Sequence, residues 1–156
     1  EKGKTAPAIP KAVKSFLSDT SSFSPEWSGS ILRMLPESVR GAYPLLREHL
    51  RILSAGICIG EAKGKDFIPA EELALSTALR PDAFPVADLD WDDASRYLKK
   101  EALLLPAGTE KGYVLVRHKK FPLGFAKHLG NRANNLYPQE WRIRTGYIPE
   151  QVKTFE

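Results

Sequence analysis

The chain has 156 residues, of which 42% are hydrophobic and 27% charged, a balance typical of a globular protein rather than a disordered one. No apolar run reaches the roughly 18 residues of a membrane-spanning helix, and the polar start EKGKTAPAIPK lacks the apolar stretch of a secretion signal. The single cysteine, Cys58, excludes an internal disulfide and a multi-cysteine zinc site. We therefore expect a cytoplasmic protein. Because the chain opens on Glu1 rather than Met, we also expect it to be a piece of a longer one.

Positive charge is concentrated in the last third of the sequence. The whole chain carries +4, a mildly basic balance that is compatible with a nucleic-acid partner without indicating one. The 28 residues from Arg117 to Arg144 contain seven Lys or Arg and one acid, Glu140, so this segment alone carries +6. Residues 88–93, in contrast, hold four acids and no base.

Residues 1–27 are rich in Lys, Pro and Ser, and we expect a linker or the tail of a preceding domain, with one short helical pattern in PKAVKSFLSD. The segment SSFSPEW is expected to be a loop. A short strand is expected at SILRMLP and a buried one at RILSAGICIGEA, whose two glycines indicate a bulge or a close backbone approach.

Helical signals in this half are uneven. Gly41 and Pro44 break ESVRGAYPLLREHL, which therefore offers at most short helical turns. The segment PAEELALSTALR predicts the clearest helix, because Pro69 suits its first turn and Glu71 and Glu72 favour its positive end. Together, residues 28–84 are expected to form a small α+β domain.

A second domain is expected over residues 85–150, followed by a tail at 151–156. Asp90 can cap a helix over WDDASRYLKKEA, with acids in its first turn and lysines in its last. Short strands are expected at VADLD, LLL, YVLVRH, LGFAKHLG and WRIRT, with GNRANNLYP as a loop. The predicted fold class is thus α+β, a small mixed segment followed by a partly open β-barrel.

No catalytic, metal or cofactor site emerges from the residues. The segments GICIG and GEAKGK match neither a dinucleotide-binding loop nor a phosphate-binding loop, and turns explain them better. The acids near Asp90 are explained by helix capping. His49, His118 and His128 are not at metal-ligand spacing, and Cys58 in an apolar stretch favours a buried, inert thiol.

The segment HKKFPLGFAKHLGNRANNLYPQEWRIR interleaves cations with aromatic and amide side chains. RNA binding uses these types, since cations meet phosphates, unpaired bases stack on rings, and amides read base edges. The alternative is that Phe121, Phe125 and Trp141 form the barrel core while the lysines face solvent. We favour the core for these aromatics and RNA contact for the cations.

Part of this segment resembles a known domain. FPLGFAKHLGNRANNLYPQEWR is similar to the C-terminal, PUA-like RNA-binding domain of bacterial Nol/Nop/Sun-type rRNA 5-methylcytosine methyltransferases. AGICIGEAKGKDFIPAEELALS resembles the short domain that precedes it, so the likeness covers roughly residues 28–146. Asn134 stands where the family often has Lys. The matching positions are Pro122, Leu123, Gly124, Phe125, Lys127, Gly130, Asn134, Asn135, Tyr137, Pro138 and Arg142.

The resemblance implies an RNA-binding module, with ribosomal RNA and the parent's own methyltransferase domain as partners. The S-adenosylmethionine site and the catalytic cysteines are expected in a domain outside this chain. The alternatives are a protein-interaction module that docks an acidic partner or that domain and, less favoured, a self-contained enzyme. The candidate RNA-binding residues are Lys119, Lys120, Lys127, Arg132, Arg142 and Arg144 for phosphates, Asn134 and Asn135 for bases or sugars, and Tyr137 for stacking or packing.

Overall fold

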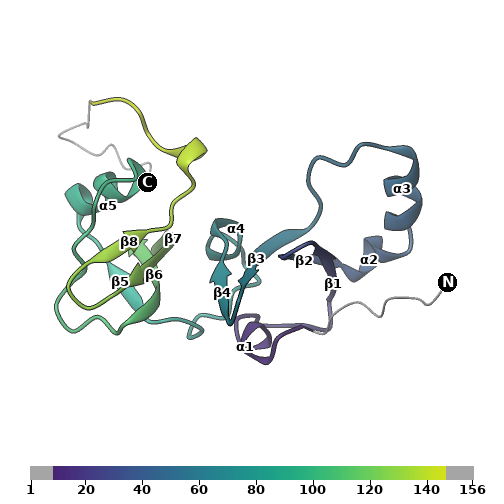
Figure 1. The fold of residues 1–156 in the computed structure, drawn as a ribbon, viewed down its shortest axis with the longest axis horizontal. Coiled ribbons are helices and arrows are strands. Elements are labelled where there is room, and N and C mark those ends of the chain that lie inside the picture. The colour runs from purple at the N-terminus through teal and green to yellow at the C-terminus, as the bar shows by residue number, and fades with distance from the viewer. Residues whose placement is uncertain (1–8, 147–156) are drawn as a thin grey trace.

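A computed structural model describes residues 9–146, which form two four-stranded sheets (Figure 1). Within these residues the strand order of each sheet follows the chain, and every pairing is antiparallel except that of β5 with β6. The first sheet consists of β1 (Phe23–Ser28), β2 (Ile31–Pro36), β3 (Ile57–Lys63) and β4 (Asp66–Pro69). The second consists of β5 (Val86–Asp88), β6 (Gly112–His118), β7 (Phe121–His128) and β8 (Ala133–Asn135).

We call residues 9–83, which include the first sheet, the first unit, and residues 84–146 the second unit. Residues 9–27 belong to the first unit, where the sequence predicts a linker. The helix α1 (Lys11–Lys14) buries Val13 completely, and Leu17 forms an isolated bridge with Leu79. The predicted loop SSFSPEW contributes β1 at the edge of the sheet. Pro25 is tolerated there because an edge strand can leave one side of its backbone unpaired.

Gly56, just before β3, and Gly60, within it, lie where a neighbouring backbone segment approaches closely, as the sequence predicts. A β-carbon on Gly56 would lie 2.2 Å from the Met34 carbonyl oxygen, and one on Gly60 would lie 2.2 Å from that of Ile68. Gly56 also has a φ of +65°, which disfavours other residues. The glycines therefore allow β3 to pack between its neighbours.

Between β2 and β3 the chain leaves the sheet as α2 (Glu37–Arg40) and α3 (Tyr43–His49). We call residues 37–55 the α3 arm; Figure 1 shows it at the end of the molecule far from the second sheet. Neither helix buries a residue, and Leu45, Leu50 and Leu53 are 60%, 60% and 85% exposed.

The helix predicted over PAEELALSTALR is much shorter in the structure. Only α4 (Glu71–Ala74) is helical, and the chain then turns. The Ala78 amide donates to Ser76 Oγ at 3.0 Å, a local side-chain bond that competes with helical hydrogen bonding. Figure 1 shows α4 between the two sheets, next to β7.

The second unit is built around the β6–β7 hairpin and α5 (Trp91–Leu98). The predicted cap is confirmed, since Asp90 Oδ1 accepts from the Asp93 amide at 2.8 Å. Two predicted strands are absent from the described residues. The segment LLL contributes only an isolated bridge between Leu103 and Ala133. The segment WRIRT begins at the last residue of a 3-10 helix, η1 (Gln139–Trp141), and forms no strand. The strand β8 forms instead within the predicted loop GNRANNLYP. The α+β class is confirmed, but the described sheets are open.

The two units share a hydrophobic core. Leu115 and Phe125 of the second sheet belong to the same buried cluster as Leu32 and Ile59 of the first. The Phe84 and Phe125 rings meet edge to face at 4.8 Å between their centroids. A second, separate cluster fills the space between α5 and the other face of β6 and β7, and contains Leu89, Ala94, Tyr97, Leu103, Val116, Ala126 and Ala133.

Candidate nucleic-acid interface

The predicted RNA-binding residues lie at both ends of the β6–β7 hairpin. Lys119 and Lys120 form its two-residue turn, since His118 pairs with Phe121. Arg132 lies beyond the other end, just before β8. Because β7 has eight residues at about 3.3 Å each, the two positions are about 25 Å apart. The candidate residues therefore form at least two contact regions rather than one cluster.

A hollow of about 860 Å³ lies between the end of α5, the loop that follows it and β8. We call it the α5–β8 hollow. It is lined by three of the predicted residues, Arg132, Asn134 and Asn135, and by two cations that sequence reasoning missed, Arg96 and Lys100. Arg96 lies on α5, and Lys100 follows it in what the sequence predicts as the last turn of this helix.

The cations of the hollow differ in their availability. The Lys100 ammonium donates to the Tyr137 carbonyl oxygen, and partial burial lowers the pKa of this lysine. Arg96 Nη1 lies 3.8 Å from Asp93 Oδ1. Arg132 is exposed and forms no ion pair with the other described residues. Arg132 is thus the side chain in this hollow most open to a phosphate.

Asn135 holds the structure of the unit. Its Nδ2 donates to the carbonyl oxygens of Tyr97 and Glu101 at 2.8 and 3.2 Å, and its Oδ1 accepts from the Tyr137 amide at 3.0 Å. The Tyr137 ring packs edge-on between Tyr97 and Trp141, at 5.4 and 6.4 Å. Asn135 therefore fastens β8 to the end of α5, and of the two predicted amides Asn134 is the exposed one.

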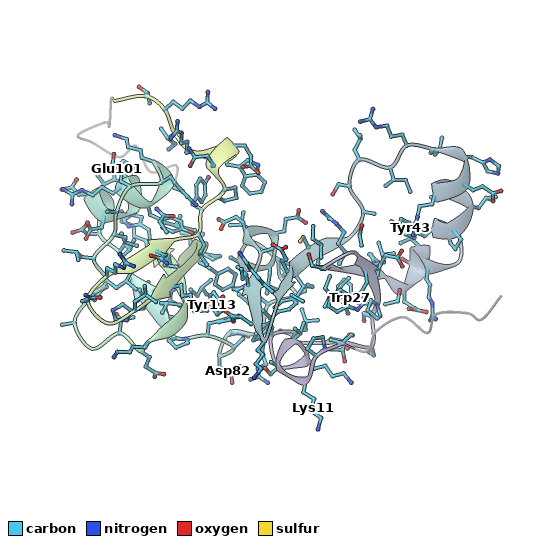
Figure 2. The ribbon with its side chains drawn as sticks, viewed as in Figure 1. Lys11, Trp27, Tyr43, Asp82, Glu101 and Tyr113 are labelled. Atoms are coloured by element: carbon cyan, nitrogen blue, oxygen red, sulfur yellow. The ribbon has the colours of Figure 1, made fainter. Side chains whose placement is uncertain are left out.

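Lys127 is engaged within the chain. Its Nζ lies 2.6 Å from Asp66 Oδ2 and 4.8 Å from the centre of the Tyr113 ring, while the Tyr113 hydroxyl donates to the same carboxylate at 2.8 Å. The hydrogen bond from Lys127 is the main cause that lowers the pKa of Asp66. Figure 2 shows Tyr113 on the side of the second sheet that faces the first. The residue expected to meet a phosphate thus links β7 to β4.

The predicted core aromatics divide. Phe125 is fully buried, as expected, but Phe121 is 73% exposed and Trp141 is 47% exposed, so the core assignment of these two is wrong. Trp141 closes η1, after which the Ile143 amide donates to the Leu98 carbonyl oxygen at 2.9 Å. This bond places the exposed Arg142 and Arg144 close to the end of α5.

Glu71 is buried between the units, where the sequence predicts an acid that favours the positive end of a helix. It is 7% exposed, and neither carboxyl oxygen has a hydrogen bond of normal geometry. Burial raises its pKa to about 8, an effect that the nearby Phe125 backbone, the Tyr97 hydroxyl and Lys100 only partly oppose. Gly124 makes room for this group, because a β-carbon there would lie 2.1 to 2.3 Å from the carboxyl oxygens and the Tyr97 hydroxyl.

No group of three or more potential metal ligands occurs among the described residues, and none of their helices is long and apolar enough to cross a bilayer. The glycine-rich segment 56–64 forms part of an antiparallel hairpin instead of a strand-to-helix loop, so it does not fit S-adenosylmethionine. Desolvation raises the pKa of the half-buried Cys58 thiol, which disfavours the reactive thiolate.

Comparison with known proteins identifies the second unit. Residues 84–143 match the family described as the methyltransferase RsmF PUA domain. A ribosomal RNA small subunit methyltransferase F from Shewanella baltica strain OS195 is 32% identical over 110 residues, which are 67% of this chain and 22% of the relative. Its counterpart from Shewanella pealeana is 32% identical over 92 residues, or 58% of this chain and 18% of the relative.

The chain thus spans about one fifth of the length of the curated relatives that it matches. The resemblance found in the sequence is confirmed by these matches: the chain carries the C-terminal PUA region of Sun-type rRNA methyltransferases.

Proposed function

We propose that this chain is the RNA-binding module of an S-adenosylmethionine-dependent methyltransferase that modifies the 5-position of cytosine in ribosomal RNA. In this proposal the chain holds structured RNA, and a catalytic domain outside it carries out the transfer. Relatives named as small-subunit rRNA methyltransferases support the choice of RNA. The cofactor and the catalytic groups are assigned to that other domain, and the chain by itself is not an enzyme.

The observation that carries the proposal is a set of cations on the second unit that no acid of residues 9–146 neutralises. Its members are exposed and form no ion pair within the described residues; they are Lys119, Lys120, Arg132, Arg142 and Arg144. The basic residues elsewhere in the segment are engaged, since Arg117 forms two hydrogen bonds with Asp88 and Lys127 pairs with Asp66. Free cations are what phosphate binding requires, because each contact releases counterions from the RNA.

Within this surface the α5–β8 hollow supplies the polar contacts. Arg132 is assigned to a phosphate at its rim, and the exposed Asn134 to a base edge or a sugar hydroxyl. Asn135, Tyr137 and Lys127 act indirectly, by fixing the backbone that presents these groups. The proposed contact set is therefore smaller than the one expected from the sequence.

Fluorescence anisotropy with small-subunit rRNA fragments tests the proposal. If five cations meet phosphates, the slope of log affinity against log salt lies between about −3.5 and −4.5. A flat salt dependence refutes the electrostatic account. Arg132→Glu reduces affinity in this assay, and Arg80→Glu is the matched control, because Arg80 lies in the first unit and already pairs with Asp82 at 2.7 Å.

A protein-interaction role is the second candidate, and the α3 arm favours it. Exposed leucines grouped on one element are typical of a surface that another protein covers, such as the parent's methyltransferase domain. An RNA competitor distinguishes the two functions, because it displaces bound RNA from the cations but leaves a protein held by the arm in place.

A further inference from the structure

The turn between β6 and β7 has a backbone that its residues disfavour. Lys119 and Lys120 have φ values of +47° and +72°. A two-residue hairpin turn with two positive φ angles favours Asn-Gly or Gly-Gly, because a β-carbon is strained there. Two lysines occupy it instead, so the chain places charge at this tip against its conformational preference. Strain of this kind is concentrated at functional sites.

An exposed ring stands directly beside these lysines. Phe121 begins β7, is 73% exposed and pairs with His118, so both side chains leave the same face of the hairpin. His118 is fixed, since its Nδ1 lies 2.9 Å from the Leu89 carbonyl oxygen and its ring meets Trp91 edge-on at 5.9 Å. Phe121 is therefore an uncovered ring on a rigid support, next to two free cations.

We infer that this tip binds an unpaired RNA base, which stacks on Phe121 while Lys119 and Lys120 hold the flanking phosphates. The inference rests on the proposed function and adds to it a particular RNA element, a loop or bulge. A single ring with two cations matches the way that proteins hold single strands, where rings take bases and cations follow the backbone. A protein interface or a membrane anchor would need a larger apolar patch than one ring supplies.

The position of the tip defines the RNA further. Because it lies about 25 Å along β7 from Arg132, one RNA must span that distance to reach both regions. A short single strand that occupies only the tip is expected to bind more weakly, and with a flatter salt slope, than a stem-loop that reaches both.

The test uses the whole chain and rRNA stem-loops that carry 2-aminopurine either in the loop or in the stem. Stacking on Phe121 is expected to change the fluorescence of the loop probe and leave the stem probe unchanged. Phe121→Ala is expected to remove this signal and to weaken binding by about 5-fold to 150-fold, the range for one lost base stack. Phe121→Tyr keeps a ring and is expected to restore both.

Leu53→Ala is the matched control, because Leu53 is also a highly exposed apolar residue (85%) and lies on the distant α3 arm. Thermal melting checks that each variant is folded. If wild type binds RNA but Phe121→Ala leaves the affinity and the loop signal unchanged, the inference is wrong and the proposed function stands. Equal binding of a duplex without a loop overturns it in the same way. If wild type binds no RNA at all, both fail.

Discussion

Replacing the two turn lysines by the pair that this turn favours, Lys119→Asn together with Lys120→Gly, separates backbone strain from charge. Each lysine holds a positive φ, which costs most L-residues about 1 kcal/mol; Asn relieves this cost by local hydrogen bonding and Gly by having no β-carbon. Relieving this strain at both positions should stabilise the fold, but glycine offsets about 0.5 to 1 kcal/mol of that stabilisation because it loses more backbone entropy on folding. We therefore expect the free energy of unfolding to rise by about 1 to 1.5 kcal/mol. For a chain of this size, the melting temperature should rise by about 2 to 6 °C.

Calorimetry measures the melting temperature, and anisotropy at several salt concentrations measures RNA affinity. The control, Lys119→Gln with Lys120→Gln, removes the same charges but keeps both β-carbons, so its melting temperature should stay near that of wild type. Both variants should lose affinity and flatten the salt slope by close to 2. If the Asn-Gly variant melts no higher than the Gln-Gln variant, the turn lysines carry no strain and the reasoning from φ fails.

Three further predictions concern the contact between the units and the RNA surface. Gly124→Ala should destabilise the fold by about 2 to 4 kcal/mol in urea, because the new methyl group meets Glu71 and Tyr97; a loss below about 1 kcal/mol contradicts this. Folding raises the pKa of Glu71 from 4.5 to about 8, so the free energy of unfolding of wild type falls as pH rises through that window, by a few kcal/mol at most. Glu71→Gln should remove this pH dependence, and an equal dependence in both proteins refutes the assignment. Arg132→Glu should weaken RNA binding by about 10-fold at low salt without changing stability. Lys127→Ala should change stability more than RNA affinity, because Lys127 pairs with Asp66. A larger loss of affinity than of stability in Lys127→Ala would restore Lys127 as an RNA contact.

Local signals made part of the fold predictable. Asp90 caps α5 because an acid three residues before a helical amide is a short-range pattern. The YVLVRH and LGFAKHLG segments form β6 and β7 because a short run of apolar residues bounded by turn residues is also a local signal. The glycines of the first sheet indicated close backbone approach for the same reason, since few other residues tolerate it.

The missed features depend on contacts between distant parts of the chain. Lys127 pairs with Asp66, 61 residues away, and no spacing rule connects them. The Asn135 side chain bonds to backbone 34 and 38 residues earlier, so an amide that suits base reading is used to hold the fold. Phe121 carries the same β-strand signal as Phe125, and only the end of the hairpin decides that its ring stays exposed. Residue type therefore indicated which segment could bind RNA, while contacts between distant residues decided which of its side chains remain free to do so.

The core shared by the two sheets has a consequence for how this chain unfolds. Leu115 and Phe125 pack with Leu32 and Ile59, so neither sheet can lose its structure without exposing apolar surface on the other. The RsmF match, which begins at residue 84, therefore starts inside a cooperative unit. The described residues should therefore melt in one transition. RNA bound at the hairpin tip should accordingly stabilise the first sheet together with the second.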